Sequence, residues 1–548
     1  MQWAVPQICC CRAVRVGGLN GDESMRENVH QLTNESAKSA SVLAPSGLKV
    51  TMEHLWLLFP VLLLIYKGFI FPLPPLDFWW HLKAGEVIAT TRSIPQVDGF
   101  SFTAEGRPFL LQNWLGELIY YWTYRAGGFP LLVMLGTILT VGAFLLMYKL
   151  CLNAARNRRI VALVGFVACL ANYGFLRPQT YSFLLFSAFY LVLSQYRERR
   201  RDQLWTLPIL MALWVNLHGA FVMGLALLGI YLSCELVRRL VDPQGTEALS
   251  TAELKKLLLV FGLCCLATLL NPEGYRIYDY VRTVVFDPGS QQLVAEWQPP
   301  RVNDLTGFLF FYCPFFLSIF TFIQSRVKPD LTETVLFFGF AALGLSAIRN
   351  AAWFGTITFP LIARYLPHFD LTPMSPLRRF TAIEKVFESS TLLEDAPAHS
   401  RINLVLLITA FIALLAQSPW IRPAITGKPL IALQTPVGVA EFIKENGISG
   451  RMFHPQEFGD YLMWRLWPQQ KTLVDGRVHL FDLEFLKEYK RVLDDPLSGD
   501  FMERWNIRYL LLSKLPDGSN SRTIGSVENS SRWSKIYEDS ISVLFVKK

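Results

Sequence analysis

The sequence predicts a mainly α, polytopic membrane helix bundle of about eleven spans, followed by a small C-terminal α/β domain. The chain is 52% hydrophobic and only 18% charged, and its mean hydropathy of +0.31 is typical of an integral membrane protein. Apolar runs of span length recur from residue 54 onward, and basic residues gather in alternate loops between them. After Trp420 the pattern changes to short strands that alternate with helices.

Composition predicts three regions. Residues 1–52 are polar, poor in aromatic residues and without periodicity, so a disordered segment is expected there. Met25 and Met52 leave open a translation start further downstream. Residues 53–420 form the predicted transmembrane domain, and residues 421–548 form the predicted soluble domain.

The predicted spans are apolar runs of roughly 16 to 22 residues. Basic clusters follow every second run, so they all lie on one side of the membrane if the N-terminus is inside. The positive-inside rule makes that side cytoplasmic, and it places the loop of residues 72–128 and everything after residue 420 outside. The net charge of +8 is therefore a topology signal, and no nucleic-acid partner is expected. The runs lie near 54–71, 129–150, 160–176, 181–196, 203–217, 220–240, 256–271, 306–325, 331–348, 351–366 and 402–419, and the clusters include Arg156, Arg158 and Arg159, Arg197 and Arg199 to Arg201, Arg238 and Arg239, Lys255 and Lys256, Arg326 and Lys328, and Arg378, Arg379 and Lys385.

The first outer loop, residues 72–128, is too long for a simple hairpin and too rich in Trp, Tyr and Phe for a flexible tether. A helix is predicted over Leu76–Thr90, and a second short helix is predicted around Glu117. Structured loops at a membrane surface often carry function, so catalytic groups are expected here. The residues that share one face at i, i+4, i+8 spacing are Asp77, His81 and Gly85 on the first helix, and Asn113, Glu117 and Tyr121 on the second.

Ionisable and polar residues gather at the predicted outer ends of the other spans. Such groups are costly near a bilayer, so together with Asp77, His81 and Glu117 they are expected to line one cavity. A transferase that uses a lipid-phosphate-linked substrate needs this mixture. A carboxylate takes the proton from an attacking hydroxyl, and Arg or His offsets charge on the departing phosphate. The outer-face set is Arg177, Trp214, Asn216, His218, Asn271, Glu273, Glu296, Trp297, Arg349 and Asn350.

Simpler interpretations of these residues stay open. Arg177 and Arg349 can snorkel at helix ends, and Asn271 before Pro272 can end a helix. His218 can be a hydrogen-bonded turn residue, and Glu117 can be solvated. The aromatic residues Trp79, Trp80, Trp114 and Trp122 can be interfacial anchors or sugar-stacking platforms.

The tail shows mixed periodicity and no Gly-rich phosphate loop. Asp475, Gly476 and Arg477 can form a tight turn closed by an ion pair, which suits a structural or an acceptor-docking role. Predicted helices cover Val437–Asn446 and Leu483–Leu493, and predicted strands cover Arg451–Phe453, Thr472–Asp475, Tyr509–Leu512 and Ile541–Val546.

Three motifs of the first outer loop resemble the GT-C superfamily of membrane glycosyltransferases. They are D-F-W-W-H at 77–81, S-I-P-x-x-D-G-F-S-F at 93–102 and N-W-L-G-E at 113–117. The chain looks most like the bacterial group related to dolichyl-phosphate-mannose protein mannosyltransferases and lipid A aminoarabinose transferases. Further motifs that fit this group are R-P-Q at 177–179, W-x-N-x-H-G at 214–219, N-P-x-G at 271–274, E-W at 296–297, R-N at 349–350, G-D-Y-L-x-W at 459–464 and D-G-R at 475–477.

The resemblance implies a bacterial inner-membrane enzyme with a long first outer loop and a periplasmic or extracellular tail. The implied reaction moves a sugar from a polyprenyl-phosphate donor to an acceptor lipid, glycan or protein at the outer face, with inversion. Asp77 would be the base, His81 would orient it or contact phosphate, and Glu117 would be a secondary acid. The candidate substrate-binding residues are Arg177, Asn216, His218, Glu296, Trp297 and Arg349.

No cofactor is expected, and a divalent metal is not favoured. The chain has a single Asp77 followed by Phe-Trp-Trp-His where better-known members have an Asp-Glu pair or a D-x-D, and one carboxylate with a His makes a poor cage for a hard cation. None of the nine cysteines falls after Cys313 or shows metal-ligand spacing, so neither a zinc site nor a disulfide framework is predicted.

Two other hypotheses stay open. A secondary transporter or lipid flippase would show paired half-repeats and charges near mid-bilayer, whereas the charges here sit at span ends. In a non-catalytic membrane assembly protein, the tail would bind partners while Asp77 and His81 pack the loop.

Overall fold

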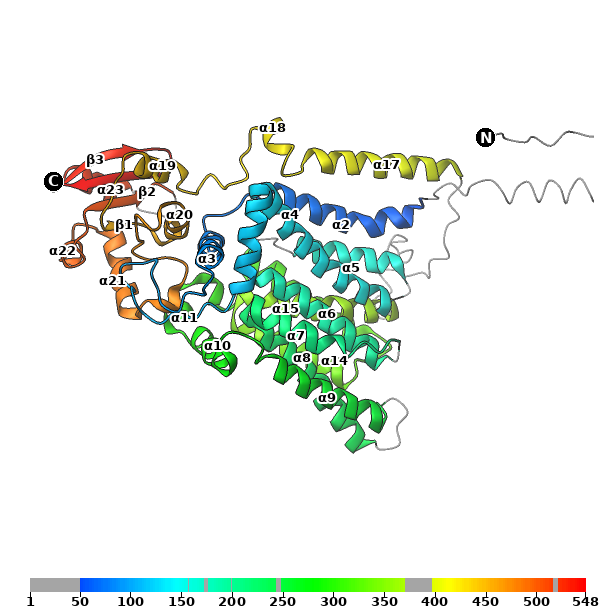
Figure 1. Cartoon of the computed structure of the whole chain (residues 1–548). Coiled ribbons are helices and arrows are strands. Elements are labelled where there is room, and N and C mark those ends of the chain that lie inside the picture. The colour runs from blue at the N-terminus through cyan, green and yellow to red at the C-terminus, as the bar shows by residue number, and fades with distance from the viewer. Residues whose placement is uncertain are drawn as a thin grey trace, which may run out of the picture.

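The computed structural model shows a bundle of long helices with a C-terminal sheet domain at one end (Figure 1). The predicted segment 1–52 falls outside the described residues except for its last three positions, and so do Arg378, Arg379 and Lys385. The structure describes residues 50–155, 157–171, 176–198, 200–242, 248–369, 397–515 and 521–548.

All eleven predicted apolar runs are largely helical. Capping boxes at Thr51, Ser250 and Asp330 fix the starts of three of the helices, because each cap side chain accepts a backbone N–H of the first turn. The bundle helices are α2 (Met52–Ile70), α4 (Trp114–Ala154), α5 (Arg158–Leu170), α6 (Gln179–Arg197), α7 (Thr206–Leu217), α8 (Val222–Val241), α9 (Thr251–Ala267), α13 (Cys313–Gln324), α14 (Leu331–Ser346), α15 (Ala351–Tyr365) and α17 (Pro397–Ala416).

Five helical stretches of the described chain are long and apolar enough to cross a membrane. Their outward faces are apolar as well; on α17, Val405 is 61% exposed and Phe411 is 55% exposed. An apolar face left open to its surroundings is typical of a helix that contacts lipid. A total of eleven spans stays a prediction. The five stretches are Met52–Ile70, Trp114–Ala154, Gly219–Val241, Leu305–Gln324 and His399–Ala416.

Short elements connect the bundle helices at the end that carries the sheet domain. A π-helical turn, η4 (Phe308–Tyr312), leads into α13. The others are η1 (Gly219–Phe221), η2 (Gly274–Arg276), α10 (Ile277–Val285), α11 (Pro288–Leu293), η3 (Ala295–Trp297), α12 (Leu305–Gly307) and η5 (Ile348–Asn350), while η6 (Leu366–His368) follows α15.

The basic residues of the predicted inner side pair with acids at the bundle end remote from the sheet domain. Arg197 and Arg238 both bind the buried Glu235, at 3.2 and 2.8 Å. Arg364 binds Glu333 at 2.8 Å. These arginines are therefore held by structural ion pairs.

The first outer loop contains the two predicted helices. The first is α3 (Phe78–Thr91), and the second is the first part of α4. Gly127 and Gly128 break α4, and the positive φ of Gly128 explains the glycine there. The kink separates the polar, aromatic start of α4 from the apolar stretch that follows Phe129.

The two predicted faces pack against each other. His81 Nδ1 lies 2.8 Å from Glu117 Oε1, and both side chains are buried. A Cβ added at Gly85 would overlap the carbonyl oxygen of Glu117 and would stand 3.1 Å from Cβ of Tyr121. Gly85 therefore sets how closely α3 approaches α4.

The C-terminal domain is built on a four-stranded sheet in the order β1-β2-β4-β3, in which β1 and β2 are parallel and the other pairs are antiparallel. Three predicted strands are confirmed as β1, β2 and β4. The predicted strand Thr472–Asp475 is wrong, because Thr472 forms only a single bridge, to Ser101 of the outer loop. The strands are β1 (Met452–Phe453), β2 (Tyr509–Ser513), β3 (Trp533–Glu538) and β4 (Ser542–Lys547), and the helices are α18 (Arg422–Thr426), α19 (Val437–Glu445), α20 (Gln456–Leu466), η8 (Val478–Leu480), α21 (Leu483–Asp494), α22 (Phe501–Arg504) and α23 (Ser521–Glu528).

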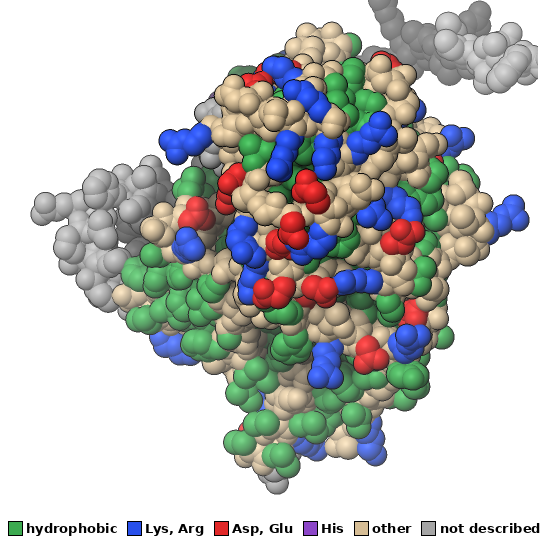
Figure 2. Space-filling model, turned by 90° about the vertical axis from the view of Figure 1, so that its left-hand side faces the viewer, with side chains coloured by type: hydrophobic (Ala, Val, Ile, Leu, Met, Phe, Trp, Pro, Cys, Tyr) green, Lys and Arg blue, Asp and Glu red, His purple; other side chains and the backbone are tan. Residues whose placement is uncertain are grey.

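The surface of this domain that faces away from the bundle carries interspersed acidic and basic side chains (Figure 2). Lys535, for example, pairs with Glu528 and Glu538 at 2.8 Å each. Such a mixed, exposed charge pattern is typical of a solvated face.

A buried ion triad joins the first outer loop to the tail. Arg477 is 1% exposed and donates to Asp98 at 2.6 Å and to Asp475 at 2.6 and 2.9 Å. The rings of Phe100 and Phe109 lie 5.1 and 4.9 Å from its guanidinium carbon. The turn 475–477 is therefore closed by an ion pair, as the sequence indicated, and it also reaches across to the loop.

We expect Arg477→Met to destabilise the fold by about 3–5 kcal/mol, because it leaves the buried Asp98 and Asp475 without their cation. Arg504→Met, at a half-exposed arginine paired with Glu488 and Asp500, is the matched control and should cost at most about 1 kcal/mol. Thermal unfolding in lipid nanodiscs measures both. Equal unfolding midpoints for Arg477→Met and the wild type would contradict a stabilising triad.

We expect Gly85→Ala to lower the unfolding midpoint, because the added methyl group pushes the backbone of α4 away from α3. Gly262→Ala in α9 is the control, since an added Cβ there meets no atom within 4 Å. Alanine is favoured over glycine in a helix, so the control should be neutral or slightly stabilising. The same midpoint shift in both variants would show that close packing at Gly85 is unimportant.

Candidate functional site

Asp77 stands at the start of α3, at the bundle end that carries the C-terminal domain. An Asp at this position usually accepts a backbone N–H of its own helix, but Asp77 makes no such capping bond. Its carboxylate instead faces Arg177, whose Nε lies 3.7 Å from Asp77 Oδ2. The side chain of Asp77 is 32% exposed, so it remains accessible.

A row of alternating charges extends from Asp77 across three connecting segments. Arg177, between α5 and α6, donates to Glu296 of η3 at 3.0 Å. Arg349 of η5 approaches the other oxygen of Glu296 at 3.7 Å. The guanidinium of Arg349 also lies over the ring of Trp297, 4.3 Å from its centroid. Five of the nine predicted site residues, Asp77, Arg177, Glu296, Trp297 and Arg349, thus meet in one place.

An apolar groove of about 300 Å³ begins at this row and runs between α4, α6 and α15. Arg177, Glu296 and Arg349 line one end of it. On α15 it extends from Ala351 to Phe359, a length of about 12 Å at helical rise. The groove thus joins an apolar channel to a charged mouth. Apolar lining residues are Ala143, Phe144, Met147, Ala168, Phe183, Phe310, Ala352 and Gly355.

The electrostatics of Asp77 suit proton transfer. Burial raises the pKa of the Asp77 carboxyl above its ordinary value, while the nearby charge of Arg177 opposes that rise. Glu296 raises the same pKa further, and Arg349 lowers it. A carboxylate whose pKa is raised is a stronger base than a free aspartate.

In the structure, the side chain of His81 is paired with α4. Its imidazole bonds Glu117 rather than Asp77, and the two side chains are 5% and 0% exposed. Burial, together with the nearby His218 and Arg177, holds the pKa of His81 well below its usual value. A neutral imidazole in this position joins α3 to α4.

The side chains of Asn216 and His218 form hydrogen bonds within the protein. Asn216 donates to the carbonyls of Ala212 and Leu270 and accepts Trp114 Nε1, all within 2.9 Å. His218 Nδ1 lies 2.8 Å from Ser182 Oγ and accepts the N–H of Ala220. These bonds involve both polar atoms of the Asn216 side chain and Nδ1 of His218.

The four tryptophans predicted as interfacial anchors differ in how far their side chains are exposed. Trp79 is fully buried and packs against Tyr461 and Trp464 of α20, at centroid distances of 4.8 and 5.0 Å. Trp80 is 8% exposed. Trp114 is half-buried, and Trp122 is 57% exposed.

Asp460 of α20 lies near Asp77, and the sequence reasoning did not single it out. It is 2% exposed, and its pKa is raised well above the usual value by burial, by Asp77 and by Asp475. The motif G-D-Y-L-x-W at 459–464 was the available signal. Its glycine allows close contact with the carbonyl of Val474, and its Tyr461 and Trp464 hold Trp79.

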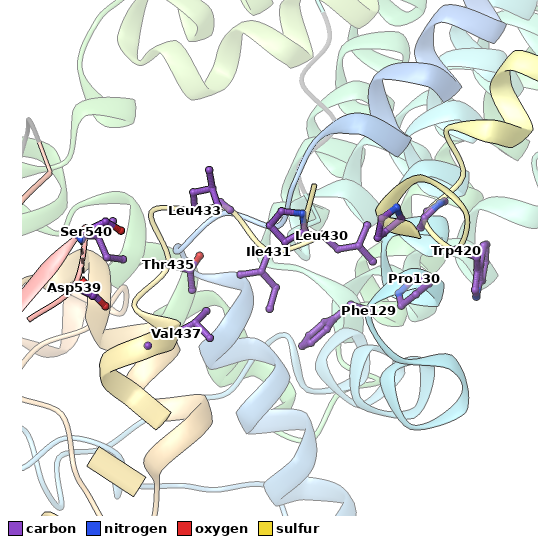
Figure 3. Close-up of a pocket in the computed structure, with 16 residues that line it drawn as sticks. Phe129, Pro130, Trp420, Leu430, Ile431, Leu433, Thr435, Val437, Asp539 and Ser540 are labelled. Carbon is purple, nitrogen blue, oxygen red and sulfur yellow. Dashed lines mark hydrogen bonds between the residues drawn. The ribbon is translucent and has the colours of Figure 1, made fainter. Parts of the chain in front are cut away.

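A second cavity, of about 680 Å³, lies between the bundle and the C-terminal domain and is separate from this site (Figure 3). Phe129, Pro130 and Trp420 border it on the bundle side, and Leu433 and Val437 on the domain side. Its charged lining residue Asp539 already accepts bonds from Tyr537, Ile541 and Ser542. The surface of the cavity is therefore mainly apolar.

Within the part of the chain that the structure describes, no group of three or more His, Cys, Asp or Glu side chains is arranged to hold a metal ion. The six described cysteines are free thiols.

No protein-family model matches the chain, and no curated protein matches it. Solved structures do match. The oligosaccharyltransferase of Archaeoglobus fulgidus, in the apo form, aligns over 86% of this chain and 70% of its own length, with 14% identity and a TM-score of 0.50. The mycobacterial arabinofuranosyltransferase AftD aligns over 90% of this chain and 41% of its own, at 13% identity and a TM-score of 0.46. ArnT from Cupriavidus metallidurans, bound to undecaprenyl phosphate, aligns over 90% and 97%, at 12% identity and a TM-score of 0.45.

The fold assignment rests on the oligosaccharyltransferase, which shares both the helical bundle and most of the chain length. The chain therefore has the same fold as this oligosaccharyltransferase.

Proposed function

We propose that the protein is an integral membrane glycosyltransferase that moves a sugar from a polyprenyl-phosphate donor to an acceptor at the outer face of the membrane. The observation that carries this proposal is the charged row from Asp77 to Arg349 at the mouth of an apolar groove. The shared fold with an oligosaccharyltransferase supports it.

The groove suits an isoprenoid chain, because its walls are largely apolar over about 12 Å beyond the charged mouth, with the hydroxyls of Thr140, Ser187 and Thr356 among them. The donor phosphate would lie between Arg177 and Arg349, whose planar guanidinium groups match phosphate oxygens. Glu296 contacts both arginines, and the donor phosphate competes with it for them.

Asp77 acts as the base. It accepts the proton of the acceptor hydroxyl while that oxygen forms a bond to the anomeric carbon of the sugar. The bond from the anomeric carbon to the phosphate oxygen breaks, and the phosphate leaves with the electron pair. Arg177 and Arg349 stabilise the charge that develops there. A single displacement of this kind inverts the anomeric centre, and with two arginines at the phosphate it proceeds without a metal.

The other predicted site residues hold the helices around the charged row in place. His81 and Glu117 hold α3 against α4, and Asn216 and His218 fix the neighbouring helix ends. Glu117 is thereby assigned a structural role in place of secondary acid.

The proposed location is a bacterial inner membrane, with the N-terminus in the cytoplasm and the C-terminal domain outside it. The positive-inside rule and the ion-paired arginines at the remote bundle end support this orientation. The site then faces the periplasmic or extracellular side, where acceptor lipids, glycans and proteins are found.

A transporter or flippase is less well supported, because the ion pairs of the described chain lie at helix ends and not across the bundle centre. A purely structural assembly role accounts for the pairing of Asp77 with Arg177, but it does not use the apolar groove beside the charged row.

We expect Asp77→Asn to reduce transfer by about 100- to 10,000-fold, because it removes the base. The assay presents polyprenyl-phosphate sugars to the protein in nanodiscs, with EDTA as a parallel arm that should change nothing. Activity in the wild type should fall as pH drops through the raised pKa of Asp77, since the base must be ionised. Arg276→Gln, at an exposed arginine on the same side, is the control. Full activity in a folded Asp77→Asn variant would exclude Asp77 as the base.

We expect Ala352→Trp to weaken undecaprenyl phosphate binding at least tenfold, because the indole fills the groove beside Arg349. Ala410→Trp, on the exposed face of α17, is the matched control. Native mass spectrometry with increasing undecaprenyl phosphate measures both variants. Wild-type affinity in Ala352→Trp would place the lipid elsewhere.

A further inference from the structure

A basic cavity lies at the bundle end remote from the C-terminal domain, where α6 ends and α9 begins. Its volume is about 390 Å³. Three cationic side chains line it, those of Arg200, Arg201 and Lys256. Two acids, Asp202 and Glu253, line it as well, so the cations are in excess. A concave surface with excess positive charge suits a phosphate group.

The two sides of the cavity contact each other directly. Tyr196, in the last turn of α6, donates from its hydroxyl to the carbonyl of Glu253 in α9 at 2.9 Å. Asp202 follows α6 in the chain and pairs with Lys256 of α9. The cavity is therefore bounded by two helices that are tied together, and not by a single loop.

The cations differ in how far they are already engaged. Arg201 is exposed, and among the described residues none forms an ion pair with its guanidinium. Arg200 pairs with Glu198 at 2.8 Å. Lys256 pairs with Asp202, and both side chains of that pair are nearly half exposed. An exposed pair of this kind contributes little to stability, so a phosphate can compete for the lysine at small cost.

The two acids of the cavity already have partners. Glu253 belongs to the capping box of α9 and accepts the N–H of Ser250 at 2.7 Å. Asp202 faces Lys256. A zwitterionic headgroup would bring its own ammonium beside three cations, whereas an anionic headgroup brings only negative charge. The cavity therefore favours an anionic ligand.

The cavity adjoins a lipid-facing surface. The helices α7 and α9 begin beside it and pack against each other. Their exposed side chains include the apolar Ile209, Leu213, Leu259 and Leu266. Trp205, between the cavity and α7, is 64% exposed. An exposed tryptophan at the border of an apolar surface is typical of the level of the lipid headgroups, so the cations lie where headgroup phosphates are found.

We propose that this cavity binds the headgroup of an anionic glycerophospholipid, with Arg201 and Lys256 at the phosphate and the acyl chains along α7 and α9. The cavity and the charged row of Asp77 lie at opposite ends of the bundle, so this inference does not depend on the proposed function. With the N-terminus inside, the lipid belongs to the cytoplasmic leaflet, whose anionic surface attracts basic residues. A soluble phosphate ester would meet the same cations but would gain nothing from the apolar faces of the two helices.

The test compares the wild-type chain with the double variant Arg201→Gln, Lys256→Gln by native mass spectrometry, with increasing phosphatidylglycerol or phosphatidylcholine. The double variant should bind phosphatidylglycerol about 10- to 30-fold more weakly, because it lacks two cations at the headgroup. The wild type should prefer phosphatidylglycerol to phosphatidylcholine, and the variant should lose that preference. Its unfolding midpoint in phosphatidylcholine nanodiscs should equal that of the wild type, since both side chains are exposed.

The matched control is the double variant Arg276→Gln, Lys428→Gln, which removes two exposed cations at the opposite end of the bundle and should keep the wild-type affinity for phosphatidylglycerol. A large excess of glycerol 3-phosphate should not displace the lipid from the wild type, and the affinity for undecaprenyl phosphate should be equal in all three proteins. Wild-type binding of phosphatidylglycerol to the Arg201, Lys256 variant would overturn the inference, as would an equal loss in the control. Displacement by glycerol 3-phosphate would assign the cavity to a soluble phosphate, and a parallel loss of undecaprenyl phosphate binding would assign it to a prenyl phosphate; either result would also overturn it.

Discussion

The architecture of the site depends on the buried contact between Arg477 and the two aspartates Asp98 and Asp475. All three side chains are at most 1% exposed, and the attraction between them offsets the cost of removing three charges from water. Asp98 also accepts the N–H groups of Phe100 and Ser101, so the triad shapes the outer loop as well as joining it to the tail. Further hydrogen bonds between Phe102 and Thr472, and between Trp467 and Gly99, join the same two segments.

These contacts between the outer loop and the tail determine what surrounds Asp77. They hold α20 against α3, which brings Asp460 and Gly476 to one side of the Asp77 carboxylate. On the other side, Arg177 links Asp77 to the groove through Glu296 and Arg349. The bundle thus supplies Arg177, Glu296 and Arg349, and the tail supplies Asp460 and Gly476. The proposed base lies where the two meet, and that position requires the whole chain.

Much of this arrangement was predictable from local pattern. Helical spacing placed Asp77, His81 and Gly85 on one face and Glu117 on another, and the structure confirms both helices and packs these faces together. The partners that lie far apart in sequence were not predictable. The sequence indicated an ion pair within 475–477, but nothing local could reveal that Arg477 also binds Asp98. Asp460 was overlooked for the same reason, since its importance comes only from its position opposite Asp77. Strand β3 was missed because its alternation of buried and exposed residues is weak.

The measurement that tests the account most directly is an experimental structure of the protein in nanodiscs with undecaprenyl phosphate bound. The account predicts the phosphate between Arg177 and Arg349, with Glu296 displaced and the isoprenoid chain along Ala351, Gly355 and Phe359 of α15. A phosphate found elsewhere, with the chain in the cavity between Phe129 and Trp420 and both arginines still bound to Glu296, would contradict it.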